Sequence, residues 1–434
     1  MKINELKENN SKVTINGFVD KIRNLQYVQF VIIRDTTGKV QVTIEKNEEN
    51  KELVEIIDNL KEESTVKVTG TLLLNEKIKL NGMEIIPETI EVTSRCTEDL
   101  PLNYKDPAST TIDTRLNYRF LDLRSEKNLL MFKVQTCFVN AMRDYVVKNN
   151  FIEIHTPKLI GAASESGSEV FELKYFDRKA YLAQSPQFYK QMALASGFEK
   201  VFEIAPAFRA ENSNSYRHAT EFTSFDIEFS YINSYEDVMD FEEDLLIAGL
   251  SKVKEQYGEE IKKVFNVDIV VPTKPFPRIK LEELYKALEE KYNFHMDFED
   301  VGDLNNESEI IASIYIKEKY NHEFVFITEF SVNKRPFYHM RKDGIPQGYD
   351  LIWKGCEITT GAQREHRVDI LEAQMIEKGV SPESLAFYLD FFKYGCPPHG
   401  GFAIGIARVM MQMFEIDNIR EATFIYRGPT RLNP

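Results

Sequence analysis

The fold is decided by the stretch EIAPAFRAE at residues 203–211, which a polar segment separates from FTSFDIEFSY at residues 222–231. In the second stretch Phe225, Ile227 and Phe229 alternate with polar residues, a period of two that is typical of a half-buried strand. The intervening Asn-Ser-Asn-Ser-Tyr has the composition of a loop. The sequence therefore predicts an antiparallel hairpin with a long polar loop.

The predicted hairpin carries a dense set of charges on its polar face. They are Arg209, Glu211, Asp226 and Glu228, with Arg217 and His218 at its open end. Two arginines and a histidine on a rigid sheet can bind a phosphate-rich ligand. Taken alone, the stretch is better interpreted as a solvated hairpin with surface ion pairs, so the decision depends on the rest of the chain.

The composition is that of a large acidic chain. Its 434 residues predict two or three domains. The formal charge, 54 − 69 = −15, argues against non-specific nucleic-acid binding but leaves room for a local basic patch. The four cysteines have no CxxC spacing, which argues against a disulfide framework or a zinc site. With neither a signal peptide nor a membrane span in the pattern, we expect a cytoplasmic protein.

Residues 1–98 predict five strands with a helix after the third, the pattern of an oligonucleotide-binding (OB) barrel. Phe30, Gln41 and Glu84 lie on three of these strands, where a ring can stack on a base while the amide and carboxylate read base edges. An exposed aromatic among ordinary polar neighbours explains them equally well. Residues 99–125 have the composition of a linker or hinge.

Residues 126–434 predict a second, larger domain. An amphipathic helix at 132–148 and a strand at 151–154 precede Pro157, an arrangement that suits either an edge used for association or a monomer core. Residues 235–320 contain acidic amphipathic helices and form an expected auxiliary region.

Several side chains of this domain suggest a small charged ligand. Gln187 and Lys190 share one helix face and suit a carboxylate, although exposed helix lysines usually have no such role. A small-residue loop at 161–169 carries Glu165, which could meet an ammonium group, although such loops are usually connectors.

Two acids and one arginine near the C-terminus point to phosphates. Asp350 and Glu357 lie on neighbouring predicted strands, and two carboxylates without His or Cys suit Mg²⁺ unless they are unrelated surface acids. Arg408 lies beside an apolar helix, where an unpaired charge is costly, so we expect a phosphate or carboxylate partner.

Together these segments resemble the aspartyl-tRNA synthetases of the archaeal and eukaryotic type, in the aspartate/asparagine/lysine subgroup of class II synthetases. The resemblance covers nearly the whole chain and rests on three ordered motifs: the helix and strand ending at Pro157, the hairpin around Arg209, and the glycine-rich strand and helix with Arg408. Gln184-Ser185-Pro186-Gln187 with Lys190 adds a specific fourth feature. No GxxxxGK[ST] loop competes for the ATP site.

The resemblance assigns a role to each matching residue. It implies ATP contacts at Arg209, Glu211, Arg217, His218, Phe222, Glu357 and Arg408, with Arg209 and Arg408 catalytic. It implies Mg²⁺ ligands at Asp350, Glu357 and Thr360. It implies L-aspartate contacts at Glu165, Ser185, Gln187, Lys190, Asp226 and Arg364. It implies an anticodon-reading face at Phe30, Gln41 and Glu84.

The resemblance also implies an α+β fold, in which an OB barrel precedes a catalytic antiparallel sheet flanked by helices, and a homodimer that charges tRNA-Asp and, as an open alternative, tRNA-Asn. An asparaginyl-tRNA synthetase is the nearest alternative, but Lys190 and Arg364 favour a side-chain carboxylate. A paralogue without aminoacylation activity is another, because Ala403 and Ala407 stand where the family has a glycine and an acid. Ser166 also replaces a usual glycine in the loop of Glu165.

Overall fold

The computed structural model describes residues 1–162, 169–213, 215–296 and 301–434. The chain divides into two compact units, Met1–Asn103 and Tyr104–Pro434. The first unit is a closed barrel with strand order β1-β2-β3-β5-β4, which confirms the predicted OB barrel. Its strands are β1 (Lys12–Asn24), β2 (Val28–Asp35), β3 (Gly38–Glu45), β4 (Thr65–Leu74) and β5 (Met83–Ser94).

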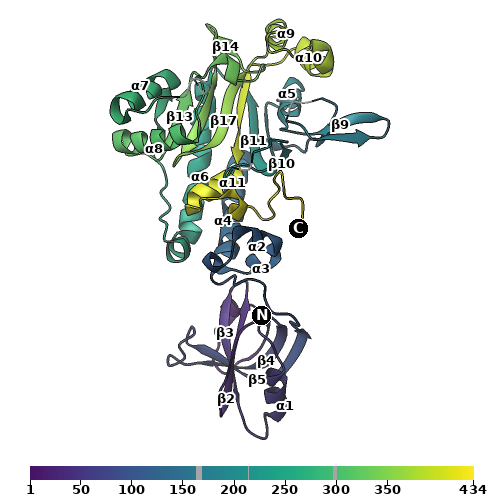
Figure 1. Cartoon of the computed structure of the whole chain (residues 1–434), viewed down its shortest axis with the longest axis vertical. Coiled ribbons are helices and arrows are strands. Elements are labelled where there is room, and N and C mark those ends of the chain that lie inside the picture. The colour runs from purple at the N-terminus through teal and green to yellow at the C-terminus, as the bar shows by residue number, and fades with distance from the viewer. Residues whose placement is uncertain (163–168, 214, 297–300) are drawn as a thin grey trace. The chain divides into compact units, whose positions relative to one another are not determined.

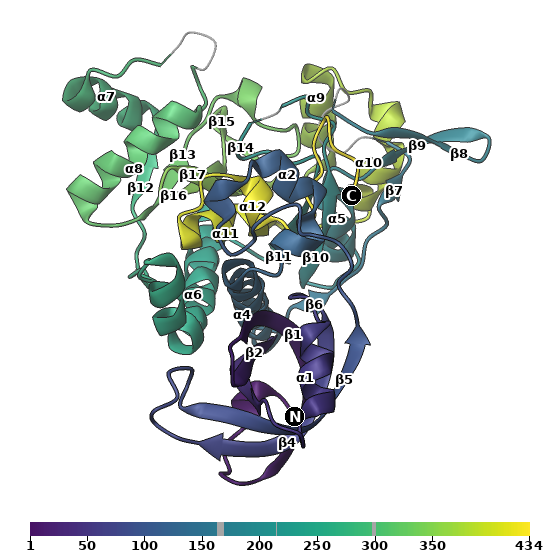
Figure 2. The same ribbon diagram turned by 60° about the horizontal axis from the view of Figure 1, so that its bottom comes forward.

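The barrel follows from strict alternation along its strands. On β2, for example, Val31 and Ile33 are buried while Phe30 and Ile32 are only half-buried. Inward apolar residues from all five strands fill one core. The helix α1 (Lys51–Asp58) follows β3 and lies beside β5 (Figure 2).

The second unit is built on an eight-stranded sheet with the order β12-β13-β16-β17-β18-β11-β10-β6 (Figure 1). Its six central strands are antiparallel, as predicted, whereas the edge strands β12 and β6 pair in parallel with their neighbours. The strands are β6 (Ile152–Glu153), β10 (Lys200–Phe208), β11 (Glu221–Ser230), β12 (Arg278–Lys280), β13 (Phe324–Thr328), β16 (Gly348–Trp353), β17 (Cys356–Arg364) and β18 (His399–Gly405).

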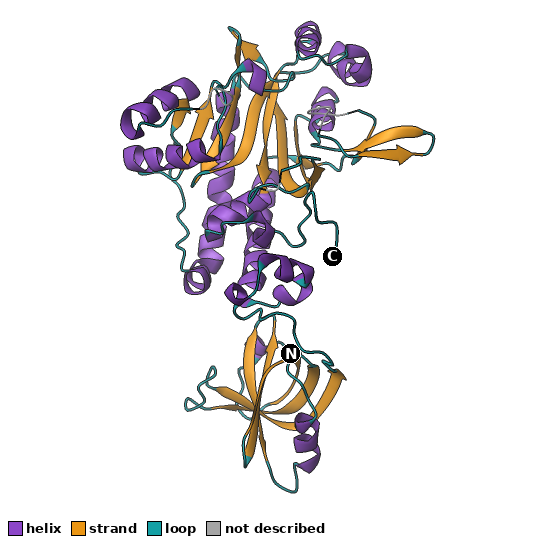
Figure 3. Cartoon of the chain, in the orientation of Figure 1, coloured by secondary structure: helices purple, strands orange, loops and turns teal. Residues whose placement is uncertain are grey.

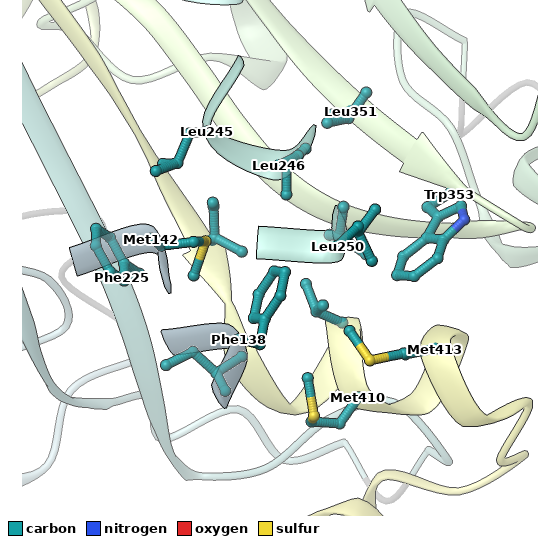
Figure 4. Close-up of a cluster of buried hydrophobic side chains, with 14 of the residues drawn as sticks. Phe138, Met142, Phe225, Leu245, Leu246, Leu250, Leu351, Trp353, Met410 and Met413 are labelled. Carbon is teal, nitrogen blue, oxygen red and sulfur yellow. The ribbon is translucent and has the colours of Figure 1, made fainter. Parts of the chain in front are cut away.

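Three helices cover one face of this sheet: α4 (Glu126–Lys148), α6 (Tyr235–Phe265) and α11 (Ile406–Phe414). Figure 4 shows Phe138 of α4, Leu250 of α6 and Met410 of α11 converging on the apolar face. Gly249 lets α4 and α6 approach closely, because a Cβ atom there would lie 2.6 Å from the ring of Phe138. This apolar layer fixes the sheet and leaves the opposite face for polar side chains.

The hairpin predicted around Arg209 is present. β10 and β11 pair in antiparallel register, with Ala207 opposite Phe222. Phe225, Ile227 and Phe229 point into the apolar core, so the alternation places Asp226 and Glu228 on the opposite face.

The remaining elements surround the sheet (Figure 3). Residues 99–125, expected to be a linker, contain two short helices in which Leu116 and Arg119 are buried. None of the helices within the described ranges is long and apolar enough to cross a membrane. The helices are α2 (Ile112–Asn117), α3 (Arg119–Asp122), α5 (Gln187–Ala195), α7 (Leu281–Tyr292), α8 (Asn306–Tyr320), α9 (Val368–Glu377), α10 (Ala386–Lys393) and α12 (Ile419–Ala422), and the small strands are β7 (Leu159–Ile160), β8 (Glu172–Tyr175), β9 (Arg178–Leu182), β14 (Arg341–Lys342) and β15 (Ile345–Pro346).

Candidate active site

A cavity of about 260 Å³ opens on the polar face of the sheet. It lies where β10, β11, β17 and β18 run side by side, next to the start of α11. The residues expected from the sequence that line it are Ser185, Arg209, Glu211, Arg217, His218, Phe222, Asp226, Glu357, Thr360 and Arg408. Segments far apart in the chain are thus brought to one cavity by the order of the sheet.

One end of the cavity is rich in cations, of which Arg209 and His218 are only loosely paired. The Arg209 side chain is 42 % exposed, and its NH1 atom lies 3.7 Å from Glu211 Oε1. Its guanidinium carbon is 5.4 Å from the centroid of the Phe222 ring. His218 Nε2 is 3.9 Å from Glu211 Oε2, and burial followed by Arg408 lowers the pKa of His218. An anionic ligand can therefore reach Arg209 and His218 without displacing a tight ion pair.

The sequence predicts a phosphate or carboxylate partner for Arg408, and the structure shows a carboxylate partner within the protein. Its NH1 atom donates to the Glu357 carbonyl oxygen at 2.9 Å and lies 3.4 Å from Glu357 Oε1. Ala403 and Ala407, where the family resemblance implies a glycine and an acid, both line the cavity. Glu357, on the strand next to β18, thus supplies the carboxylate that position 407 lacks.

The three residues expected to bind Mg²⁺ differ in their hydrogen-bond partners and in their position relative to the cavity. Glu357 lines the cavity and accepts a hydrogen bond from the Thr360 hydroxyl at 3.1 Å. Burial would raise the pKa of Glu357, but Arg408 and Arg217 lower it below its ordinary value, so the carboxylate is ionised at neutral pH. Asp350 instead accepts both NH groups of Arg335, at 2.9 and 2.6 Å.

This arrangement fits a hard cation that takes most of its ligands from phosphates and water. No group of three or more His, Cys, Asp or Glu side chains capable of holding a metal exists within the described ranges. One ionised carboxylate, Glu357, with the Thr360 hydroxyl beside it, is the donor set that Mg²⁺ uses alongside substrate phosphates.

The other end of the site is a closed network of buried charges. Lys190 Nζ lies 3.0 Å from Asp226 Oδ1 and 3.3 Å from Glu228 Oε2. Arg364 Nε donates to Glu228 Oε1 at 2.9 Å, and Gln187 Nε2 to Glu228 Oε2 at 3.4 Å. Lys190, Glu228, Asp226 and Arg364 are all less than 5 % exposed. Asp226 lines the cavity, so this network forms the wall behind it.

The network keeps Glu228 ionised. Burial would raise the pKa of Glu228, but Arg364 and Lys190 lower it below its ordinary value. Burial lowers the pKa of the neighbouring His399 to about 4, so this imidazole is neutral and adds no further positive charge. Two buried cations, Lys190 and Arg364, are therefore held by two buried carboxylates behind the cavity wall.

The expected anticodon-reading residues lie together on the outside of the barrel. Gln41 Nε2 donates to Glu84 Oε2 at 3.2 Å, and Thr43 also donates to this carboxylate. Phe30 lies opposite Thr43 in the β2–β3 register. Phe30, Gln41 and Glu84 are each half-buried, so this face combines a ring with polar groups that a base edge could bind.

Two families match the two units. Residues 111–426 match the tRNA synthetases class II (D, K and N), and residues 13–93 match the OB-fold nucleic acid binding domain. The chain belongs to the class II tRNA synthetases of the D, K and N group. Such synthetases use ATP.

Relatives of this synthetase align with it along almost their whole length. The aspartate–tRNA(Asp/Asn) ligase of Aeropyrum pernix is 40 % identical, covering 98 % of this chain and 96 % of the relative. The aspartate–tRNA(Asp) ligase of Pyrococcus abyssi is 42 % identical, covering 98 % and 97 %. Among solved structures, the asparaginyl-tRNA synthetase of Pyrococcus horikoshii in complex with asparaginyl-adenylate has a TM-score of 0.92 and 31 % identity, covering 100 % and 99 %.

Three residues of the synthetase site received no role from the sequence. Glu228 bridges Lys190 and Arg364, and its position two residues after Asp226 on a strand was a usable signal. Glu309 and Arg335 hold Arg217 and Asp350 from distant segments, and no local pattern indicated them. Glu165 and Ser166 lie outside the described residues.

Proposed function

We propose that this synthetase is an aspartate–tRNA ligase, which activates L-aspartate with ATP and transfers it to the 3′ end of tRNA-Asp. The observation that carries the proposal is the pair of buried cations, Lys190 and Arg364, behind a cavity whose other end carries Arg209 and Arg408. A side-chain carboxylate suits two cations, whereas a neutral amide would not compensate their charge. The aligned relatives named as aspartate–tRNA ligases support this choice.

In the first step the aspartate α-carboxylate attacks the α-phosphorus of ATP. A carboxylate–phosphorus bond forms while the bond to the bridging oxygen of pyrophosphate breaks, so the reaction needs positioning and charge neutralisation, with no side-chain nucleophile. Arg209, exposed in the cavity and loosely paired, is placed to neutralise the α-phosphate. Arg408, Arg217 and His218 would bind the leaving phosphates, and the Phe222 ring would stack on adenine.

In the second step a ribose hydroxyl at the 3′ end of the tRNA attacks the carbonyl carbon of aspartyl-adenylate. The new ester bond forms as AMP leaves, so the chain must hold the adenylate and admit the tRNA end. Glu211 and Ser185 line the cavity and would contact the nucleotide and the amino acid, respectively. When bound by Glu357 and Thr360, Mg²⁺ would neutralise phosphate charge, and Asp350, paired with Arg335, would support this site from behind.

The amino acid would bind at the closed end of the cavity. Lys190 and Arg364 would receive its side-chain carboxylate, and Asp226, which lines the cavity, would accept its ammonium group. Gln187 already contacts Glu228 and would fix the pocket wall. We also propose that Glu165 would bind the ammonium group of the amino acid.

The barrel would supply tRNA selection through Phe30, Gln41 and Glu84. Stacking on one aromatic ring is worth about 1–3 kcal/mol per base, so Phe30→Ala should raise the KM for tRNA by about tenfold or more. Amino-acid activation should be unchanged in this variant, because activation needs no anticodon. We further propose a cytoplasmic homodimer associating through α4 and the edge strand β6, which sedimentation should reveal as a particle of two chains.

ATP–pyrophosphate exchange with L-aspartate and L-asparagine, measured separately, tests the proposal. We expect aspartate to be preferred by at least about 100-fold in kcat/KM. Exchange with asparagine alone would identify an asparaginyl-tRNA synthetase, and folded protein that exchanges with neither amino acid would identify a paralogue without this activity. Charging purified tRNA-Asp and tRNA-Asn side by side then determines whether the ligase acts on one tRNA or on both.

A further inference from the structure

One residue of the region expected to be auxiliary reaches the cavity from behind. Glu309 lies in the first turn of α8 and is 2 % exposed. Its Oε2 atom accepts from Arg217 NH1 at 2.6 Å and from the backbone NH of Glu357 at 2.8 Å. Arg217 and Glu357 both line the cavity, whereas Glu309 does not. A single carboxylate oxygen thus joins two ligand-facing segments that are 140 residues apart in the chain (357 − 217).

The helix that carries Glu309 is held rigidly. Asn305 caps its N-terminus by accepting the Ser308 backbone NH at 2.9 Å, and its inner face packs into a separate apolar cluster with α7 and β13. The Ser313 hydroxyl accepts the Gly355 backbone NH at 2.7 Å. Gly355 has a φ of +82°, and a Cβ atom there would lie 3.1 Å from the Ile310 backbone, so the β16–β17 turn fits closely against α8.

These contacts have a consequence for Arg217. Arg217 lies between β10 and β11 in the hairpin loop, whose described residues belong to no helix or strand that could fix a flexible arginine. A short, charge-assisted hydrogen bond from a rigid helix fixes the guanidinium beside the cavity before any ligand arrives. The same oxygen also accepts the backbone NH of Glu357. The carbonyl oxygen of Glu357 in turn accepts a hydrogen bond from Arg408.

We propose that Glu309 is a positioning residue for ATP, which fixes the Arg217 guanidinium and the Glu357 backbone in the places from which they contact the triphosphate. This inference rests on the proposed function, because ATP must be the ligand of the cation-rich end. It gives the α7–α8 region a part in nucleotide binding, although its helices lie outside the cavity wall.

Glu309→Gln tests the inference with little change in shape. The amide oxygen can still accept the Glu357 backbone NH, but the charge that holds Arg217 is lost. We expect the KM for ATP in pyrophosphate exchange to rise about tenfold, since a hydrogen bond to a charged group contributes about 1.5–3 kcal/mol. The KM for L-aspartate should stay within about twofold of wild type, because the amino-acid end does not contact Glu309. The matched control is Glu307→Gln, an exposed acid in the same helical turn, which should leave both KM values unchanged.

A double-variant cycle with Arg217→Gln separates positioning from a purely structural role. If Glu309 acts through Arg217, the double variant should bind ATP as weakly as Arg217→Gln alone, with no further loss. Independent effects that multiply would overturn the inference, as would a folded Glu309→Gln protein with an unchanged KM for ATP. Should Glu309→Gln unfold, the double variant, which leaves no unpaired buried charge, still allows the comparison with Arg217→Gln.

Calorimetric titration of wild type and of each variant with ATP and Mg²⁺ distinguishes a failure of the Glu309 inference from a failure of the proposed function. Wild type that binds ATP but exchanges pyrophosphate with no amino acid would contradict the ligase proposal while leaving the role of Glu309 testable. If the wild-type protein exchanges pyrophosphate but Glu309→Gln binds ATP with unaltered affinity, only the role of Glu309 is overturned.

Discussion

The two ends of the cavity solve the same electrostatic problem in opposite ways. At the amino-acid end, Lys190 and Arg364 are buried and closely paired with Asp226 and Glu228, at 2.9–3.3 Å. At the phosphate end, Arg209 is 42 % exposed and lies 3.7 Å from its acidic neighbour. The first end is a closed network of paired charges, whereas at the second end Arg209 has only a distant acidic neighbour until a ligand arrives.

The difference follows from what each end is proposed to bind. A single carboxylate cannot balance two buried cations, so the protein supplies its own acids, and these must stay ionised in the absence of substrate. A triphosphate brings several negative charges, so Arg209, which is proposed to bind it, can stay exposed to water, where an unpaired charge costs little. Mutations should therefore affect stability at one end and catalysis alone at the other.

The largest effect is expected at the open end, from Arg209→Ala. Loss of an arginine that neutralises a transferring phosphoryl group should reduce kcat/KM for ATP in pyrophosphate exchange by about 10³-fold or more. Because the Arg209 side chain is exposed and loosely paired, Tm should stay within about 2 °C of wild type. A variant that keeps more than a tenth of the activity would show that Arg209 does not act in the reaction.

Lys190→Met tests the closed end. It leaves Asp226 and Glu228 buried with one cation fewer, so the free energy of unfolding should fall by about 3–5 kcal/mol. Denaturant unfolding measures this loss, and Lys179→Met, at a pair with 71 % and 48 % exposed side chains, is the control that should change stability by less than about 1 kcal/mol. If Lys190→Met were as stable as the control, the closed network would not be a structural element.

The closed end also shows how far the sequence could predict the site. The period of two on β11 was sufficient to place Asp226 on the polar face, and Glu228 follows from the same alternation. The partners Lys190 and Arg364 come from α5 and β17, and the antiparallel strand order that brings β17 near β11 is a long-range property. The sequence therefore allowed the charged residues of the site to be predicted, but not which of them pair with one another.

Two other features were beyond the sequence. Residues 99–125 look like a linker because they contain prolines and polar residues, yet Arg115 and Arg119 there bind Asp122, and Arg115 also contacts Glu421, 306 residues later. Glu309 is one acid among many in an acidic region, and only its contacts with Arg217 and the Glu357 backbone distinguish it. Side chains whose role depends on a partner hundreds of residues away leave no periodic signal.

Glu242→Gln sharpens the comparison with a buried acid that has no cation beside it. Burial raises the pKa of Glu242 from 4.5 to about 8, and the charges acting on it are the acids Glu243 and Asp350. The folded state therefore keeps a proton that the unfolded chain releases, so this group makes stability fall as pH rises from about 4.5 to about 8.

Glutamine does not titrate and can still accept the Tyr349 hydroxyl, which now donates to Glu242 at 2.7 Å. The variant should lie within about 1 kcal/mol of wild type near pH 5 and exceed its unfolding free energy by about 4 kcal/mol near pH 8. Urea unfolding at both pH values measures the difference. Parallel stability curves for the two proteins would show that Glu242 titrates normally, so that burial without a cation has no cost here.

The smallest effect is expected from Ala407→Glu, which introduces at the open end the acid that the family resemblance implies at this position. Arg408 already donates to the Glu357 carbonyl and lies 3.4 Å from its carboxylate, so a second acid should contribute no more than about 1 kcal/mol. The affinity for ATP and Mg²⁺, measured by calorimetry, should therefore change by less than about fivefold. Ala407→Gln has nearly the same size without the charge and controls for crowding in the cavity. A gain in ATP affinity of more than tenfold with glutamate but not with glutamine would mean that Glu357 does not replace the missing acid. Arg408, at the open end of the cavity, would then be less well paired than its contacts with Glu357 indicate.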